Sequence, residues 1–146
     1  MRVVLDTNVW LDWLVFDDPG IAQIRKAVKR GRVELCVDAA CEEELARVLA
    51  RGFAKRALNH KEQATCIAQC RRIARRVEAS LTEAERKGLP SCRDADDQKL
   101  LEAALAAGAA FLVTKDRELL RLAKKGMPFQ VVTPAEFCKV LKIHRQ

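Results

Sequence analysis

Short apolar runs alternate along this chain with longer segments in which apolar residues recur every three or four positions. The runs at residues 2–5, 33–37, 110–113 and 129–132 are rich in Val, Leu and Phe and have the length of β-strands. The longer segments have the periodicity of amphipathic helices. Strands that alternate with helices of this size predict an α/β fold, with a mainly parallel sheet covered by helices on both faces.

Capping residues and glycines set the expected helix boundaries. Asp18 followed by Pro19 is a typical helix start, and Thr133-Pro134-Ala135-Glu136 is a capping box with proline in the first turn. Residues 82–93, which contain Gly, Pro and Ser, are predicted to form a partly ordered surface loop. The predicted helices run from Val9 to a break near residues 17–19, from that break to Gly31, over residues 39–51, 61–79, 96–107 and 117–125, and from residue 134 onward.

Length and composition indicate a single cytoplasmic domain. With 146 residues, 49% of them apolar, we expect one domain over residues 1–146. No apolar run approaches the roughly 18 residues of a membrane span, and the chain passes from Met1 into a strand without a signal-peptide pattern. The six cysteines form no Cys-x-x-Cys unit, and His60 and His144 are isolated, so we expect reduced cysteines and no zinc site.

Acidic residues follow two of the predicted strands at the point where each strand ends. Asp6 comes directly after the first strand, and Asp116 follows Val113 and Thr114 at the end of the third. The carboxyl ends of parallel strands share one edge of a sheet, and ligands bind there. Carboxylates gathered at that edge repel each other unless a cation lies among them, and all-oxygen ligation suits Mg²⁺ or Mn²⁺. The alternative is that each aspartate only caps the helix after it.

A cluster of three glutamates lies near the start of the predicted helix at residues 39–51. The apolar stripe of this helix includes Leu45 and Leu49, so Glu43 points almost directly away from the core. Glu42 and Glu44 flank the stripe on opposite sides. The helical phase therefore leaves two candidates for a ligand, Glu42 and Glu44, and does not choose between them.

A third acidic cluster opens the predicted helix at residues 96–107. Asp94, Asp96 and Asp97 occupy three of four consecutive positions. Aspartate is common at helix N-caps and in first turns, where it accepts hydrogen bonds from free backbone N–H groups. A helix has one N-cap position, which explains one aspartate. Three aspartates in this segment therefore point to a further role.

Net charge adds a candidate polyanion surface. The chain carries +7, and residues 47–76 contain nine Lys and Arg against one Glu. Within the predicted helix at residues 61–79, Arg71, Arg72, Arg75 and Arg76 form like-charged pairs four positions apart, which oppose helix formation unless an anion binds. These four arginines are the candidate nucleic-acid contacts. The alternative is a solvated helix face.

Taken in order, these motifs resemble the PIN-domain ribonucleases, and within them the toxin components of toxin–antitoxin systems. The similarity covers nearly the whole chain, and the order and spacing of the motifs make it specific. The matching segments are Leu5-Asp6-Thr7-Asn8-Val9, Glu44-Leu45, Asp94-Ala95-Asp96-Asp97 followed by Leu101 and Ala104, the run from Leu112 to Leu120, and the run from Val131 to Phe137.

The resemblance implies a PIN-like three-layer α/β/α sandwich with four or five parallel strands. It also implies four acids that bind one or two Mg²⁺ or Mn²⁺ ions for hydrolysis of RNA. Further implications are an antitoxin partner and a homodimer or higher oligomer. By position, the four acids fall on Asp6, Glu44, Asp97 and Asp116, with Asp94 or Asp96 as auxiliaries and Asn8 and Thr114 as the small polar residues of the site.

The sequence therefore predicts a metal-dependent endoribonuclease acting on single-stranded or structured RNA. Two other α/β classes place an aspartate after the first strand, and both fit less well. A HAD-type phosphatase needs a second aspartate where this chain has Asn8, and a receiver domain needs an acidic pair at the end of the first strand, where Asp6 stands alone. A catalytically silent PIN-like module that binds RNA or regulates remains the alternative within the same fold.

Overall fold

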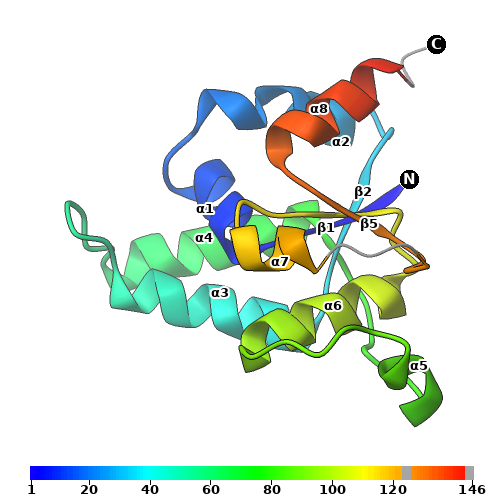
Figure 1. Cartoon of the computed structure of the whole chain (residues 1–146). Coiled ribbons are helices and arrows are strands. Elements are labelled where there is room, and N and C mark those ends of the chain that lie inside the picture. Colours follow the sequence, from blue (N-terminus) through cyan, green and yellow to red (C-terminus); the bar gives the residue numbers. More distant parts are fainter. Residues whose placement is uncertain (123–125, 144–146) are drawn as a thin grey trace.

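A five-stranded, entirely parallel sheet forms the centre of the protein (Figure 1). The computed structural model describes residues 1–122 and 126–143. The strand order β3-β2-β1-β4-β5 places the first strand in the middle, which confirms the predicted parallel sheet. The strands are β1 (Arg2–Leu5), β2 (Glu34–Val37), β3 (Arg75–Arg76), β4 (Phe111–Val113) and β5 (Gln130–Val132).

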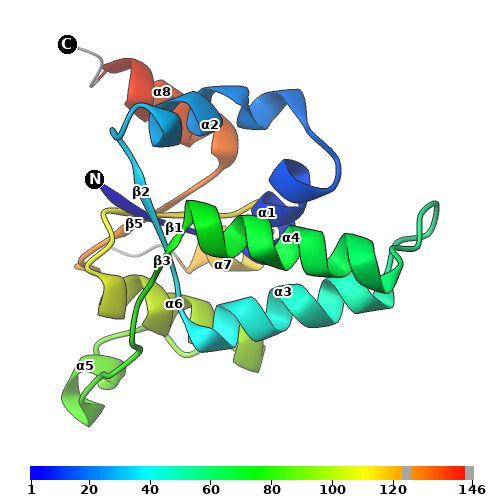
Figure 2. The ribbon, with the colours of Figure 1, turned by 180° about the vertical axis from the view of Figure 1, so that it is seen from behind.

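Helices connect successive strands and cover both faces of the sheet (Figures 1 and 2). Two of the helices are short: η1 begins at Pro19, and α5 is formed by a brief polar segment. The helices are α1 (Thr7–Leu14), the 3₁₀ helix η1 (Pro19–Ile21), α2 (Ala22–Lys29), α3 (Ala39–Arg51), α4 (His60–Ile73), α5 (Glu83–Lys87), α6 (Ala95–Ala107), α7 (Arg117–Arg121) and α8 (Pro134–Ile143).

Alternate residues of each strand face opposite sides of the sheet and build two apolar cores. Val3 and Leu5 of β1 belong to the larger core, which includes residues of α1, α2, α3, α4 and α8. Val4, between them, belongs to the second core, with Leu101 of α6 and Leu119 of α7. Helices therefore bury both faces of the central strands, as the predicted three-layer α/β/α sandwich requires.

The predicted helix at residues 61–79 is wrong over its last six residues, 74–79. α4 ends at Ile73, the backbone of Ala74 is extended, and Arg75 and Arg76 form the short edge strand β3 beside Cys36 and Val37 of β2. The backbone N–H groups of this segment bond to the edge of β2, which a continued helix would leave open. The argument from like-charged arginines four positions apart on one helix therefore fails.

Two other segments differ from the prediction in detail. The surface loop expected at residues 82–93 contains the short helix α5, which a capping box between Thr82 and Glu85 begins. The helix predicted at residues 117–125 is α7, which ends at Arg121. The remainder of that predicted helix at residues 123–125, and His144, lie outside the described residues.

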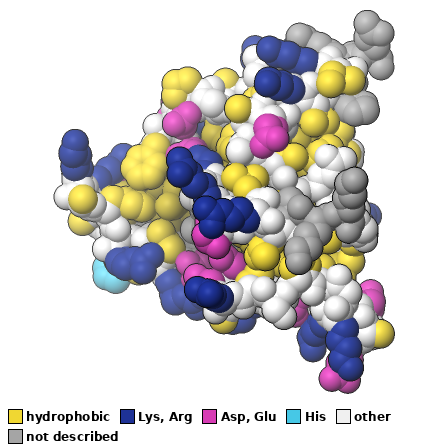
Figure 3. Space-filling view, viewed as in Figure 1, with side chains coloured by type: hydrophobic (Ala, Val, Ile, Leu, Met, Phe, Trp, Pro, Cys, Tyr) yellow, Lys and Arg dark blue, Asp and Glu magenta, His cyan; other side chains and the backbone are white. Residues whose placement is uncertain are grey.

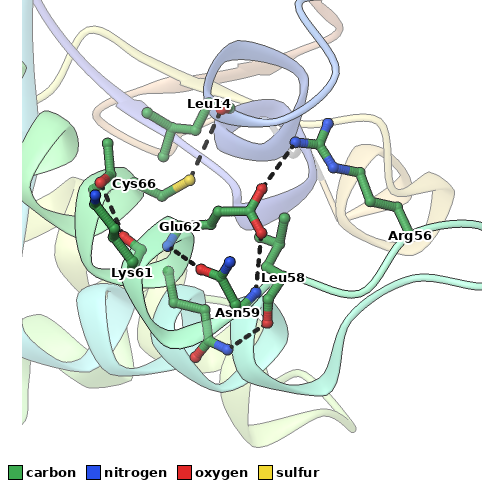
Figure 4. Close-up of polar contacts among 9 residues, drawn as sticks. Leu14, Arg56, Leu58, Asn59, Lys61, Glu62 and Cys66 are labelled. Atoms are coloured by element: carbon green, nitrogen blue, oxygen red, sulfur yellow. Dashed lines mark hydrogen bonds and ion pairs between the residues drawn. The ribbon is translucent and has the colours of Figure 1, made fainter.

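The start of α4 is fixed by a local network that the sequence did not reveal (Figure 4). The Asn59 side chain accepts a hydrogen bond from the Glu62 N–H, and Glu62 accepts from the Asn59 N–H, which makes a capping box. Arg56 pairs with Glu62 at 3.4 Å. The Cys66 thiol donates to the Leu14 carbonyl at 3.8 Å, so α4 is attached to α1.

The cysteines and the lengths of the helices complete the description of the fold. All six cysteines are free thiols, and Cys36, Cys66 and Cys70 are buried, in keeping with small apolar core residues. Within the described ranges, none of the helices combines the length and apolar character needed to cross a bilayer.

Candidate metal centre

Asp6 lies where β1 ends and α1 begins, at the carboxyl edge of the central strand. Its Oδ1 accepts a hydrogen bond of 2.7 Å from the Thr7 N–H, so it caps α1 as the alternative interpretation anticipated. Its Oδ2 accepts bonds from the Thr114 hydroxyl at 2.6 Å and from the Asn8 amide at 3.3 Å. The cap and a ligand role are compatible, because each carboxylate oxygen has two lone pairs.

Thr114 joins two of the candidate acids. The side chain is fully buried directly after β4. Its hydroxyl donates to Asp6 and accepts a 3.0 Å hydrogen bond from the Asp116 N–H. Asp116 in turn caps α7 by accepting from the Glu118 N–H at 2.9 Å. This chain of contacts holds the exits of β1 and β4 in a fixed relation.

A cleft lies between the start of α1, the first half of α3 and the start of α6. The side chains of Asp6, Glu44 and Asp97 line it, so three of the four predicted acids, each from a different element, meet there. Asp116 borders the same region, since its charge acts on both Asp6 and Asp97. The full lining comprises Asp6, Thr7, Ala40, Cys41, Glu44, Asp94, Asp96, Asp97, Lys99 and Leu100.

The structure distinguishes the two glutamates that helical phase could not. Glu42 is buried and turned away from the cleft, where Arg71 Nε donates to it at 2.7 Å and Arg76 Nη1 at 2.8 Å. Glu44 lines the cleft. Glu43 is exposed, as predicted from the helical phase. Glu44 is thus the glutamate in position to act with Asp6 and Asp97.

Burial and mutual repulsion disfavour negative charge in this cluster. Burial raises the pKa of Asp6, the hydrogen bonds from Thr114 and Thr7 oppose that shift, and the charges of Asp116 and Glu44 add to it. The pKa of Asp97 is raised to about 6, first by burial and then by the surrounding aspartates, Asp116 foremost. A cation placed among these carboxylates would offset both effects.

The residues present fit a hard divalent cation. The candidate donors are carboxylate oxygens, which Mg²⁺ and Mn²⁺ prefer. Within the described ranges, the Asn8 Oδ1 atom is buried without a hydrogen-bond partner, beside Asp6. Such an oxygen needs water or a cation to satisfy it. As they stand in the described ranges, no three or more Asp, Glu, His or Cys side chains lie close enough together to hold an ion.

The arginines predicted to bind nucleic acid do not share one face. Arg71 and Arg76 neutralise the buried Glu42, and Arg75 lies 3.4 Å from Glu34. Arg72 lines a surface groove between α4 and the segment formed by α1 and α2. All these guanidinium groups lie at the surface, and their contact with nucleic acid remains a prediction. Basic side chains also border the acidic region in the space-filling view (Figure 3).

Three charged residues near the centre escaped the sequence analysis. Asp38 follows β2 and is buried, with Oδ1 accepting from the Cys41 N–H at 2.9 Å. The pattern that revealed Asp6, an aspartate directly after a strand, could have revealed it. Asp12 of α1 is buried and pairs with Lys115 at 2.6 Å. This ion pair ties α1 to the segment after β4, in which Lys115 lies between Thr114 and Asp116. Residues so distant in sequence give no local signal of that pairing.

Comparisons with known proteins agree with this architecture. A family model for the PIN domain matches residues 2–118. The structure of VapBC2 from Rickettsia felis bound to a promoter DNA fragment is similar, with a TM-score of 0.62 and 16% identity over 91% of this chain and 98% of that chain. The structure of PAE2754 from Pyrobaculum aerophilum has a TM-score of 0.62 and 15% identity over 99% of this chain and 91% of that chain.

At such identities the two structures establish a shared fold and nothing more. A search of curated protein sequences gave no significant match. The family model is the stronger finding, because it spans most of the chain and includes all four candidate acids. It confirms the family resemblance seen in the sequence motifs, and the chain belongs to the PIN-domain family.

Proposed function

We propose that this protein is a metal-dependent endoribonuclease, and that it is the toxin component of a toxin–antitoxin pair. The observation that carries the proposal is the cleft in which Asp6, Glu44 and Asp97 meet, with Asp116 tied to Asp6 through Thr114. Membership of the PIN-domain family supports nuclease activity. Mg²⁺ or Mn²⁺, one or two ions, is the proposed cofactor.

In the proposed phosphodiester hydrolysis, the residues of this centre have different roles. Asp6, Glu44, Asp97 and Asp116 are the proposed ligands, with Asp94 and Asp96 as auxiliaries. Thr114 and Asn8 orient the Asp6 carboxylate through hydrogen bonds. A bound divalent cation lowers the pKa of a water molecule and neutralises charge on the phosphate. The pKa of Asp97 is raised only while the carboxylates lack a counter-ion, and a bound cation would restore its negative charge, as its proposed role as a ligand requires.

RNA is the proposed substrate, and it is held mainly through its backbone. The +7 net charge and the basic surface residues favour a polyanion. The chain has no Tyr and few Phe and Trp, so base stacking contributes little. Phosphate contacts position a nucleic acid without reading its sequence. Selection of the cleavage site would then depend on which strand segments reach the cleft.

An antitoxin protein is the proposed partner. The Rickettsia felis structure of similar fold is a VapBC2 assembly on promoter DNA, and the motifs of this chain resemble those of toxin components. A homodimer or higher oligomer and a cytoplasmic location belong to the same proposal. A DNA-binding protein encoded directly upstream would support the pairing.

The test is cleavage of a labelled single-stranded RNA by chelator-treated protein. We expect cleavage after addition of Mg²⁺ or Mn²⁺, no cleavage with chelator, and far less cleavage of a DNA of the same sequence. A protein that binds the RNA and never cleaves it, with either ion and across pH 6 to 9, would instead be the catalytically silent module.

A further inference from the structure

We propose that Arg47 is a built-in competitor of the metal: its guanidinium occupies Glu44 and Asp96 in the metal-free protein and lowers the affinity of the cleft for divalent cations. The inference rests on the proposed metal site and adds a regulatory residue to it. It makes metal binding, and with it the proposed activity, depend on displacement of an internal cation.

The bridge joins two helices whose residues line the cleft. A single nitrogen of Arg47, Nη2, lies 2.6 Å from Glu44 Oε2 and 3.2 Å from Asp96 Oδ1. Arg47 and Glu44 are one turn apart on α3, and Asp96 is in the first turn of α6, which packs against α3. Both acids line the cleft, so the guanidinium lies at its rim.

Arg47 is distinctive among the basic residues of this region. In the described part of the chain, no other Lys or Arg lies within ion-pair distance of the carboxylates that line the cleft. Lys115, which adjoins Asp116 in the sequence, is held instead by Asp12. Lys99 lines the cleft and forms no ion pair within the same residues. The internal counter-charge of the proposed ligand Glu44 is therefore Arg47.

A guanidinium and a metal ion cannot share Glu44 without a cost. Arginine remains charged and cannot ligate a cation, so it can only move away or repel a divalent ion brought next to it. The contact also engages one of the two Glu44 oxygens, which leaves only the other free to ligate a cation while the bridge is intact. Metal binding must either break the bridge or bring a second cation close to the guanidinium, and both oppose the binding. Because Arg47 is half exposed, that opposition is modest.

The test measures Mn²⁺ binding by calorimetry in the absence of RNA, with wild-type protein, Arg47→Gln and a matched control. Arg51→Gln is the control, since Arg51 is one turn further along α3, is exposed and has no ion-pair partner in the described ranges. We expect Arg47→Gln to bind Mn²⁺ about three- to tenfold more tightly than wild type. Arg51→Gln should differ from wild type by less than about twofold, because salt screens distant charges.

A second variant, Arg47→Lys, and a second measurement, the unfolding temperature, give independent checks of the competition. Arg47→Lys keeps the charge and loses the planar fork, and should bind Mn²⁺ with an affinity between those of wild type and Arg47→Gln. Without metal, Arg47→Gln should unfold at a lower temperature than wild type, because the carboxylates lose their counter-ion. Saturating Mn²⁺ should raise its unfolding temperature by more than it raises that of wild type.

The outcomes separate this inference from the proposed function. If wild-type protein binds Mn²⁺ and folded Arg47→Gln binds it equally or more weakly, the competition is refuted and the metal site stands. If neither protein binds Mn²⁺ at millimolar concentration, the metal site and the inference fall together. Loss of the tight binding in the double variant Asp6→Asn, Arg47→Gln would assign it to this cleft.

Discussion

The hydroxyl of Thr114 donates a 2.6 Å hydrogen bond to Asp6, across a pair of neighbouring parallel strands. The same oxygen accepts from the backbone of Asp116. One buried side chain thus orients the first candidate ligand and the loop that carries the last. The geometry of the centre depends on this link as well as on the acids themselves.

Replacing Thr114 with Val keeps the shape of the side chain and removes the link. The variant should lose about 1 to 2 kcal/mol of stability, because the hydroxyl satisfies two polar groups in a buried place. The pKa of Asp6 should rise further, since the Thr114 hydrogen bond lowers it. Urea unfolding measures the first effect, and Mn²⁺ binding as a function of pH measures the second. Thr114→Ser, which keeps the hydroxyl, is the control; equal losses in both variants would assign the effect to packing alone.

The stability of the metal-free protein should depend on pH in a way that reflects the raised pKa of Asp97. Its pKa in the folded protein, about 6, lies above its ordinary value of 3.8. Between these values the folded state binds more protons than the unfolded chain, so this group favours folding at low pH and opposes it as pH rises. The penalty develops from about pH 4 and is fully present above about pH 6.5. The unfolding temperature of Asp97→Asn should therefore exceed that of wild type by an amount that grows as the pH rises from about 4 to about 6.5.

Thermal unfolding with chelator, from pH 4 to 8, provides the comparison. Other carboxylates with lowered pKa values, such as Glu62, contribute in the opposite direction and cancel between variant and wild type. A constant difference between Asp97→Asn and wild type over this range would contradict the raised pKa. Added Mn²⁺ should reverse the order above pH 6.5, because only the wild-type carboxylate holds the ion.

The four candidate arginines should differ in what they contribute: Arg72 and Arg75 to RNA binding alone, and Arg71 and Arg76 also to the stability of the fold. Arg72→Gln with Arg75→Gln should leave the fold intact and weaken RNA binding for all sequences alike. The slope of log K against log salt should become shallower by roughly 0.7 for each phosphate of a single strand that is no longer neutralised. Filter binding at several salt concentrations measures both. Unchanged affinity and slope would mean that these two side chains are only solvated.

Arg71→Gln or Arg76→Gln should destabilise the protein in addition to any effect on RNA. Each pairs with Glu42, which is only 7% exposed and would keep a buried charge with one partner. We expect the unfolding temperature to fall by a few degrees. Glu42→Gln added to Arg71→Gln should restore part of the loss, whereas an additive loss would show that the pair is not coupled.

Sequence patterns predicted four of the five strands and two of the acids that follow them, because a buried strand and its exit leave a local signature. Asp6 and Asp116 were identified in this way. The choice between Glu42 and Glu44 needed tertiary information, since both flank the same helical stripe. Arg71 and Arg76 decide it from a distant segment.

The edge strand β3 could not be predicted for a similar reason. Arg75 and Arg76 continue the periodicity of the preceding helix, and two exposed arginines carry no strand signal. Their extended conformation comes from the open edge of β2 and from the Glu42 ion pair. The bridge from Arg47 to Asp96 likewise depends on the packing of α3 against α6.

Cleavage of single-stranded RNA by Asp6→Asn, at saturating RNA and limiting Mn²⁺, tests the central claim most directly. The substitution removes one charge from the cluster and keeps the side-chain shape, so the relief of carboxylate repulsion should keep the fold intact and circular dichroism should be unchanged. We predict that metal-dependent cleavage is abolished while RNA binding persists. Cleavage at the wild-type rate would contradict a metal-centred mechanism in this cleft.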